Sequence, residues 1–386
     1  MEFDHGSSYF LPFTNIDILP IADNMPPSSA SDVKALDDVI TSTLALIGQF
    51  VSSLSGSSAS TAKPIAKPPN PLDILGDAAA LLKAHVTKLS LLAINKPFTA
   101  SAVTKVIREL TGTCLPALIS AVQICEQEKS TWGGFMGREA QHRVRRVFKE
   151  LESLLQEVRN IAQGSGAGFR GNRDSLSSTG VVWESCDALL ELKKLGLAGL
   201  AVQKAEQWRD TIKDAITELQ EWKEGEDLDT EGQKDALLDS DDEAVEGDTD
   251  SIEDMFNAAN SMPADRPELK QLVEEAMEKL KKIGILYQAL IKRRLKSYTS
   301  EAGDQKAGKQ SSAEYLDSIV TNMRVMPHMV DELASTFYDL DEEQAKSALE
   351  RCLIKAQDTA ALAELTYSGA EDEFTVWSKK WKEAIG

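Results

Sequence analysis

Apolar side chains recur along most of this chain at alternating spacings of three and four residues, and this period constrains the fold more than any other feature. The clearest run consists of Leu269, Val273, Ala276, Leu280, Ile283, Tyr287 and Leu290. Residues at these spacings share one face of an α-helix, so each run predicts a helix with one buried stripe. No β-branched alternation and no Asn-Gly hairpin signal occurs. The sequence therefore predicts an all-α fold of about nine helices in antiparallel bundles.

Proline and glycine mark the expected ends of these helices. Gly133 and Gly134 end one unit, and Gly112 with Pro116 predicts a kink or a split in another helix. Among the expected helices are those at about 72–94, 138–163, 176–194, 196–223, 341–367 and 370–385.

The organisation of the chain follows from shifts in composition. Segments rich in Ser, Pro and Gly interrupt the periodic runs and read as loops or linkers. Four parts are expected: a poorly ordered lead-in at 1–30, a helical bundle region at 31–223 with linkers at 55–71 and 164–174, an acidic disordered linker at 224–264, and a second helical region at 265–386 that packs on the first.

The acidic linker differs sharply from the rest of the chain. Residues 224–254 hold 15 Asp and Glu but one Lys. Charge repulsion there outweighs any gain from burial, so this segment is expected to be disordered. Ser240 and Ser251 each precede acidic residues and are candidate phosphorylation sites, although a passive solvated segment would show the same pattern.

Charge and hydropathy exclude several classes of function. The formal net charge is −20, which argues against direct binding of nucleic acid or of a membrane surface through bulk charge. The first residues show no basic and apolar pattern of a secretory signal, and no apolar stretch is long enough to span a membrane. The four cysteines form no CxxC pair and are expected to be reduced thiols in the core, as in a reducing compartment.

No motif that carries catalytic chemistry stands out. The only match to G-x-G-x-x-G, at 166–171, follows a helical pattern instead of a strand and is interpreted as a loop. The histidines show no ligand-like spacing, and the acidic run lacks the spacing of a calcium loop. We therefore expect no catalytic, cofactor or metal site, and a protein that is not an enzyme.

The densest basic cluster is open to two interpretations. Lys292, Arg293, Arg294 and Lys296 could form a nuclear-import signal. The same residues also suit the carboxyl end of a helix, where cations offset the helix dipole. The second interpretation needs no partner and is favoured.

Short motifs in a fixed order resemble the cyclin-D-binding protein family. Val182, Trp183 and Cys186 match a V-W-x-x-C segment that a long helix follows, and the acidic stretch comes directly after that helix. Further along, the segment 331–338, with Asp331, Leu333 and Tyr338, resembles an Asp-rich element of the family. The resemblance covers most of the chain.

This resemblance implies an all-α adaptor without a catalytic site or cofactor. It would bind cyclin-type or helix-loop-helix partner proteins in the cytoplasm and nucleus, and would regulate cell-cycle progression or transcription. Two alternatives stay open on the residues alone: a cytoskeletal or junctional scaffold similar to vinculin, and an enzyme with an unrecognised site. The oligomeric state does not follow from the sequence.

Overall fold

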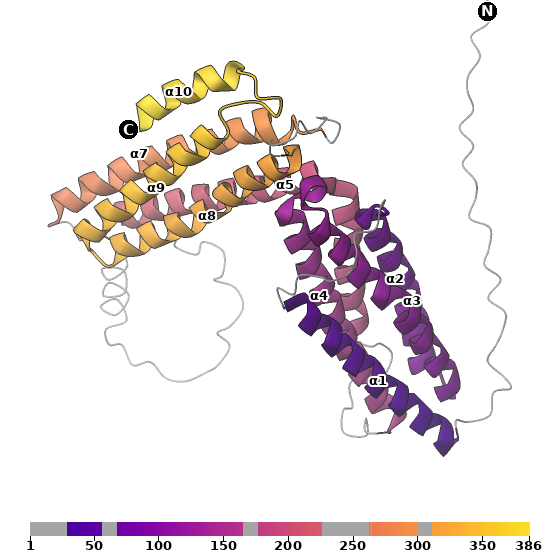
Figure 1. The fold of residues 1–386 in the computed structure, drawn as a ribbon. Coiled ribbons are helices and arrows are strands. Elements are labelled where there is room, and N and C mark those ends of the chain that lie inside the picture. The colour runs from indigo at the N-terminus through magenta and orange to yellow at the C-terminus, as the bar shows by residue number, and fades with distance from the viewer. Residues whose placement is uncertain (1–28, 56–67, 165–176, 226–261, 264, 300–310) are drawn as a thin grey trace, which may run out of the picture.

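The computed structural model describes residues 29–55, 68–164, 177–225, 262–263, 265–299 and 311–386 (Figure 1). Over these ranges the chain forms nine α-helices and one short π-helical segment, with no β-strand. The predicted all-α fold is confirmed. Every helix contributes apolar side chains to the buried core. Most of the predicted lead-in, of both linkers and of the acidic segment lies outside the described ranges.

The first group of helices is drawn in indigo and purple in Figure 1. It contains α1 (Ala30–Ser55), α2 (Pro71–Ile94), α3 (Ala100–Gln127) and α4 (Lys129–Ala162). Helix α2 begins at a strong start signal, because Asn70 Oδ1 accepts a hydrogen bond from Leu72 N at 2.9 Å and Pro71 occupies the first turn. Helix α3 continues through Pro116 as one helix, so the split expected there is absent.

The second group of helices is drawn in orange and yellow in Figure 1. It contains α7 (Pro267–Leu290), the π-helical segment η2 (Ile291–Leu295), α8 (Ser312–Tyr338), α9 (Glu342–Leu362) and α10 (Glu373–Ile385). Polar side chains cap the starts of three of these helices: Ser311 before α8, Asp341 before α9 and Asp372 before α10. Each cap accepts a hydrogen bond from an amide that has no partner within its own helix.

Helix α5 (Ser177–Glu224) belongs to both groups. Its first half packs on α2, where the hydroxyls of Ser90 and Thr179 lie 2.7 Å apart. Its second half packs on α7 and α8, where the rings of Trp222 and Tyr338 meet edge to face at 5.4 Å. The change occurs at Gly196, which has φ 62° and ψ −169°. An L residue strongly disfavours that backbone conformation.

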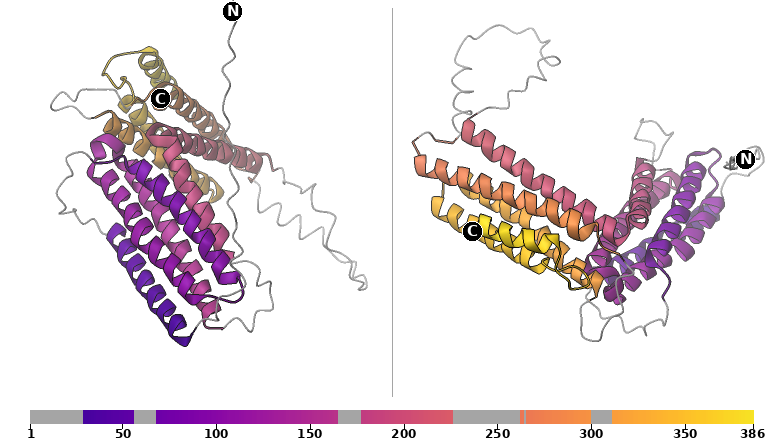
Figure 2. Two further views of the ribbon diagram at one scale, coloured as in Figure 1. Left: turned by 90° about the vertical axis from the view of Figure 1, so that its right-hand side faces the viewer. Right: turned by 90° about the horizontal axis from the view of Figure 1, so that it is seen from above.

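The two groups therefore meet at an angle, as the two views of Figure 2 show. The division of the chain near residue 224 stays a prediction. The packing adds that the chain passes from one group to the other at Gly196, where a kink separates the two helical halves of the 48-residue α5. Helices α4 and α8 also meet at this junction.

Candidate functional site

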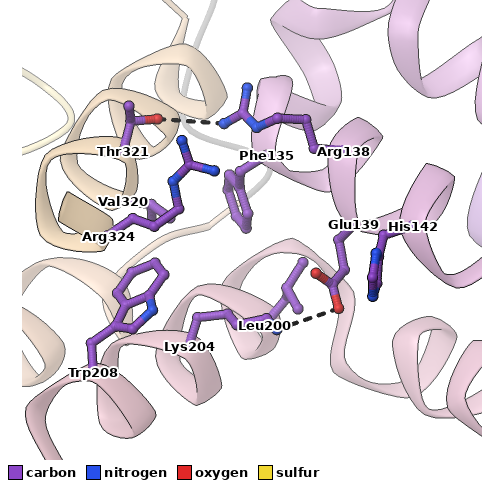
Figure 3. A pocket seen from close by; sticks show the side chains of 10 residues that line it. All are labelled: Phe135, Arg138, Glu139, His142, Leu200, Lys204, Trp208, Val320, Thr321 and Arg324. Carbon is purple, nitrogen blue, oxygen red and sulfur yellow. Dashed lines mark hydrogen bonds and ion pairs between the residues drawn. The ribbon is translucent and has the colours of Figure 1, made fainter. Parts of the chain in front are cut away.

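Helices α4, α5 and α8 border a cavity of about 330 Å³ at the junction of the two groups (Figure 3). We call it the junction pocket. Its volume lies near the lower end of the range for small-ligand sites. The lining residues are Phe135, Arg138, Glu139 and His142 of α4, Leu200, Lys204 and Trp208 of α5, and Val320, Thr321 and Arg324 of α8.

A bend in α4 forms one wall of the junction pocket. Gly133 has φ 67° and ψ 156°, so the helical hydrogen-bond pattern restarts beyond it. The Asp317 carboxylate of α8 accepts a hydrogen bond from the backbone N of Phe135, with a distance of 2.6 Å to Oδ1. A Cβ on Gly134 would lie 3.0 Å from Asp317 Oδ2. The two glycines thus allow α8 to approach closely and cap the restarted helix from outside.

Glu139 is the only carboxylate among the residues that line the junction pocket. Its Oε1 lies 2.8 Å from Arg143 Nε and 3.5 Å from Lys204 Nζ. Burial acts to raise the pKa of Glu139, but Arg143 and Lys204 together hold it below its usual value. Glu139 therefore stays ionised at neutral pH, and its charge is compensated within α4 and α5.

Two arginines from different helices approach the same part of the pocket. Arg138 Nη2 lies 3.4 Å from Thr321 Oγ1 and 3.2 Å from Asp317 Oδ1. Arg324 lies one turn beyond Thr321 on the same face of α8, and Figure 3 draws both guanidinium groups on the side of Phe135. Arg324 is exposed and forms no ion pair with any residue that the structure describes.

The remaining lining residues are largely apolar. Leu200 and Val320 are buried beneath the cavity, and Phe135 is 7% exposed. Trp208 is half-buried and packs at the edge of the core. The junction pocket thus combines an apolar floor and two aromatic rings with cations at its rim.

The residues of the two family-like motifs lie apart from this pocket. Val182 and Cys186 are buried in the first half of α5, and Trp183 beside them has a buried indole nitrogen without a hydrogen-bond partner. On α8, Leu333 is buried, whereas Asp331 is exposed and Tyr338 packs on Trp222. The two motifs thus lie on different helices, α5 and α8, and none of their residues lines the junction pocket.

The basic cluster is largely engaged in intramolecular contacts. Arg294 is 1% exposed, and its guanidinium lies 2.8 and 2.9 Å from the two carboxylate oxygens of Asp372. It also lies 4.4 Å from the ring centroid of Phe374. The bonds from Arg294 hold the pKa of Asp372 at about 2. Arg293 pairs with Glu373 and Lys296 with Glu206, while Lys292 is exposed.

The remaining residues singled out in the sequence are the two candidate phosphorylation sites and the four cysteines. Ser240 and Ser251 lie outside the described residues. All four cysteines are buried and free, and burial raises the pKa of Cys125, Cys186 and Cys352 to about 12. Thiols with such a pKa are poor nucleophiles at neutral pH.

The described ranges contain neither a cluster of metal-ligating side chains nor a helix that could span a membrane. No three His, Cys, Asp or Glu side chains come together there in a way that could hold a metal ion. No described helix has both the length and the apolar content needed to cross a membrane.

The junction pocket was not predicted from the sequence. Arg138, Lys204 and Arg324 come from three helices and share no motif. The one available signal was the Gly133-Gly134 pair, which marks a place where another helix can approach closely. The glycine pair does not indicate which helix approaches, so it could not predict that these three cations lie in one pocket.

The fold defines an all-α protein of two joined groups of helices. Residues 74–225 match the sequence model of the family described as Grap2 and cyclin-D-interacting, N-terminal. This segment is a domain of that family, which confirms the resemblance. It runs from α2 to the end of α5, so it contains the α4 and α5 walls of the junction pocket but not α8.

Two fungal proteins are similar over most of the chain. An uncharacterized protein of Schizosaccharomyces pombe is 27% identical over 316 residues, which cover 81% of this chain and 84% of the relative. An uncharacterized protein of Saccharomyces cerevisiae is 25% identical over 276 residues, which cover 69% and 71%. The similarity therefore extends beyond the family segment in both relatives.

Proposed function

We propose that this protein is a non-enzymatic helical adaptor that binds partner proteins, with a cyclin-type protein as the first candidate. The observation that carries the proposal is the family match over residues 74–225, whose description names a cyclin-D interaction. Helix-loop-helix proteins are the second candidate, by the resemblance alone. Such partners would make the protein a regulator of cell-cycle progression or transcription in the cytoplasm and nucleus.

The chemistry of the described residues supports binding over catalysis. The buried cysteines have raised pKa values, and the pKa of Glu139 is lowered by the neighbouring cations Arg143 and Lys204. Neither kind of group is poised as a nucleophile or as a general base near neutral pH. Rigid helices that present exposed side chains are suited to recognising another folded protein.

The direct test is binding of the full chain to purified cyclins of its own organism, measured by biolayer interferometry. We expect saturable binding to at least one G1-type cyclin, and none to an unrelated helical protein of similar charge. Absence of binding to every cyclin and to helix-loop-helix proteins would contradict the proposal.

A matched pair of substitutions tests whether the family segment makes the contact. Leu91 in α2 is 53% exposed and lies inside the segment, whereas Ile354 in α9 is 51% exposed and lies outside it. Leu91→Asp should weaken binding more than Ile354→Asp does, because only Leu91 lies on the family segment. Equal loss in both variants would place the contact elsewhere.

A further inference from the structure

The junction pocket is basic although the protein is strongly acidic. Three cations line it, Arg138, Lys204 and Arg324, against the single carboxylate of Glu139. Two positive charges are thus in excess among the lining residues, in a chain whose net charge is −20. Arg138 lies 3.2 Å from Asp317 Oδ1 and Lys204 lies 3.5 Å from Glu139 Oε1, whereas Arg324 has no acidic partner among the described residues. An anion in the pocket would supply that missing partner and lower the free energy of the site.

The donors of the pocket suit a compact oxyanion. Arg138 and Arg324 present planar guanidinium groups from α4 and α8, and the Thr321 hydroxyl of α8 lies 3.4 Å from Arg138 Nη2. Arginine binds phosphate and carboxylate through paired N–H donors, and such charge-assisted bonds are about twice as strong as neutral ones. Lys204 adds an ammonium group from α5.

The cavity is larger than an isolated anion requires. Phe135 and Trp208 line it together with the buried side chains of Leu200 and Val320. These apolar groups can pack on the part of a ligand that carries the anion. The volume of about 330 Å³ leaves room for a side chain but not for a large cofactor.

From this geometry we propose that the junction pocket binds a phosphate monoester carried on a phosphorylated side chain of a partner protein. A phosphate monoester carries a charge of about −1.5 to −2 at neutral pH and three acceptor oxygens, which suit the donors of Arg138, Arg324 and Thr321, whereas an Asp or Glu side chain offers only two oxygens. That a protein presents the phosphate rests on the proposed function above.

The experiment uses the indole N–H signal of Trp208 in the full-length protein labelled with ¹⁵N. The protein has six tryptophans, and the Trp208 signal is the one missing from the Trp208→Phe variant. Capped phosphotyrosine and capped phosphoserine are titrated as probes, with capped tyrosine and capped serine as uncharged controls. Inorganic phosphate and AMP are titrated in separate samples.

We expect a saturable shift of the Trp208 signal with at least one capped phosphorylated amino acid and none with the uncharged controls. Arg324→Gln should weaken that binding about tenfold, because one charge-assisted bond is lost. Arg108→Gln is the matched control: Arg108 is exposed on α3, away from the pocket, and its substitution makes the same change of charge. The five other indole signals report whether each variant is folded.

Three results would overturn the proposal. The first is no saturable shift with either capped phosphorylated amino acid. The second is equal weakening by Arg324→Gln and Arg108→Gln, which would indicate unspecific attraction. The third is binding of inorganic phosphate or AMP as tight as that of the capped amino acids, which would assign the pocket to a free phosphate compound.

The proposal and the proposed function can fail separately. The titration contains no cyclin, so a negative cyclin assay leaves its outcome unchanged. If cyclin binding is saturable and the titration shows no shift, the pocket proposal alone is wrong.

Discussion

Two helices of this protein bend at a glycine with nearly the same backbone conformation, but in different surroundings. Gly133 in α4 has φ 67° and ψ 156°, and Gly196 in α5 has φ 62° and ψ −169°. A Cβ added to Gly133 would lie 3.2 Å from the carbonyl oxygen of Ala313 and 3.4 Å from the Cβ of Asp317. A Cβ added to Gly196 would meet nothing within 4 Å.

The difference in surroundings shows that the two positions require glycine for different reasons. At Gly196 only the backbone conformation excludes other residues. At Gly133 the backbone conformation and the close approach of α8 both do. The bend in α4 is therefore held from outside, by Asp317, whereas the bend in α5 is held by the packing of its two halves in separate groups of helices.

The largest effect is expected for Gly133→Ala. Strain at this backbone conformation costs about 1–3 kcal/mol, and overpacking against α8 adds a similar amount. The free energy of unfolding, measured by urea denaturation, should fall by about 3–5 kcal/mol. If Gly133→Ala lowers the free energy of unfolding no more than Gly196→Ala does, α8 can shift to accommodate the added methyl group. The two bends would then not differ in the way described.

Gly196→Ala should cost less, about 1–3 kcal/mol, because backbone strain acts there without a clash. Gly180→Ala is the control in the same helix: Gly180 also has open space around it, but its φ is not positive. That substitution should leave stability unchanged or raise it by up to about 1 kcal/mol. Urea denaturation of both variants measures the difference.

Asp317→Ala should cost about 1–2 kcal/mol, since the backbone N–H of Phe135 loses the cap supplied by α8. Asp317→Asn keeps an acceptor oxygen and should lose about half as much. Thermal unfolding followed by circular dichroism compares the two variants. If both lose equally, the carboxylate acts through its charge instead of through the cap.

The smallest effect is expected for Arg138→Gln. Its ion pair with Asp317 has an N to O distance of 3.2 Å, and the Arg138 side chain is 49% exposed. Exposed pairs contribute about 0–1 kcal/mol. A larger loss in urea denaturation would show that the ion pair, and not the cap on Phe135, holds α8 against the bend.

Periodicity predicted the helices well because the buried stripe of each helix is encoded locally. Leu280, Ile283 and Leu316, predicted on inward faces, are fully buried. Both bends also fell at expected helix boundaries, near Gly133 and at 194–196. Of the kink or split expected at Pro116, the split is absent, because one proline removes one hydrogen bond of α3 and the packing of that helix offsets the loss.

The residues of the junction pocket could not be predicted from the sequence, for a physical reason. A periodic run says which face of a helix is buried, but not which other helix covers it. Arg138 and Arg324 are both exposed and lie 186 residues apart in the sequence. Only the approach of α8 to the bend in α4 brings the two side chains to one cavity.

The passage of α5 through both groups has a practical consequence for dissecting the chain. The family segment ends at residue 225, just after the end of α5, so it includes the second half of α5, which packs in the other group of helices. Excised there, it would leave Ile212 and Leu219, both fully buried in the whole protein, stripped of α7 and α8. We therefore expect the family segment to be less stable when excised than a piece that ends at Gly196, where α5 passes between the two groups.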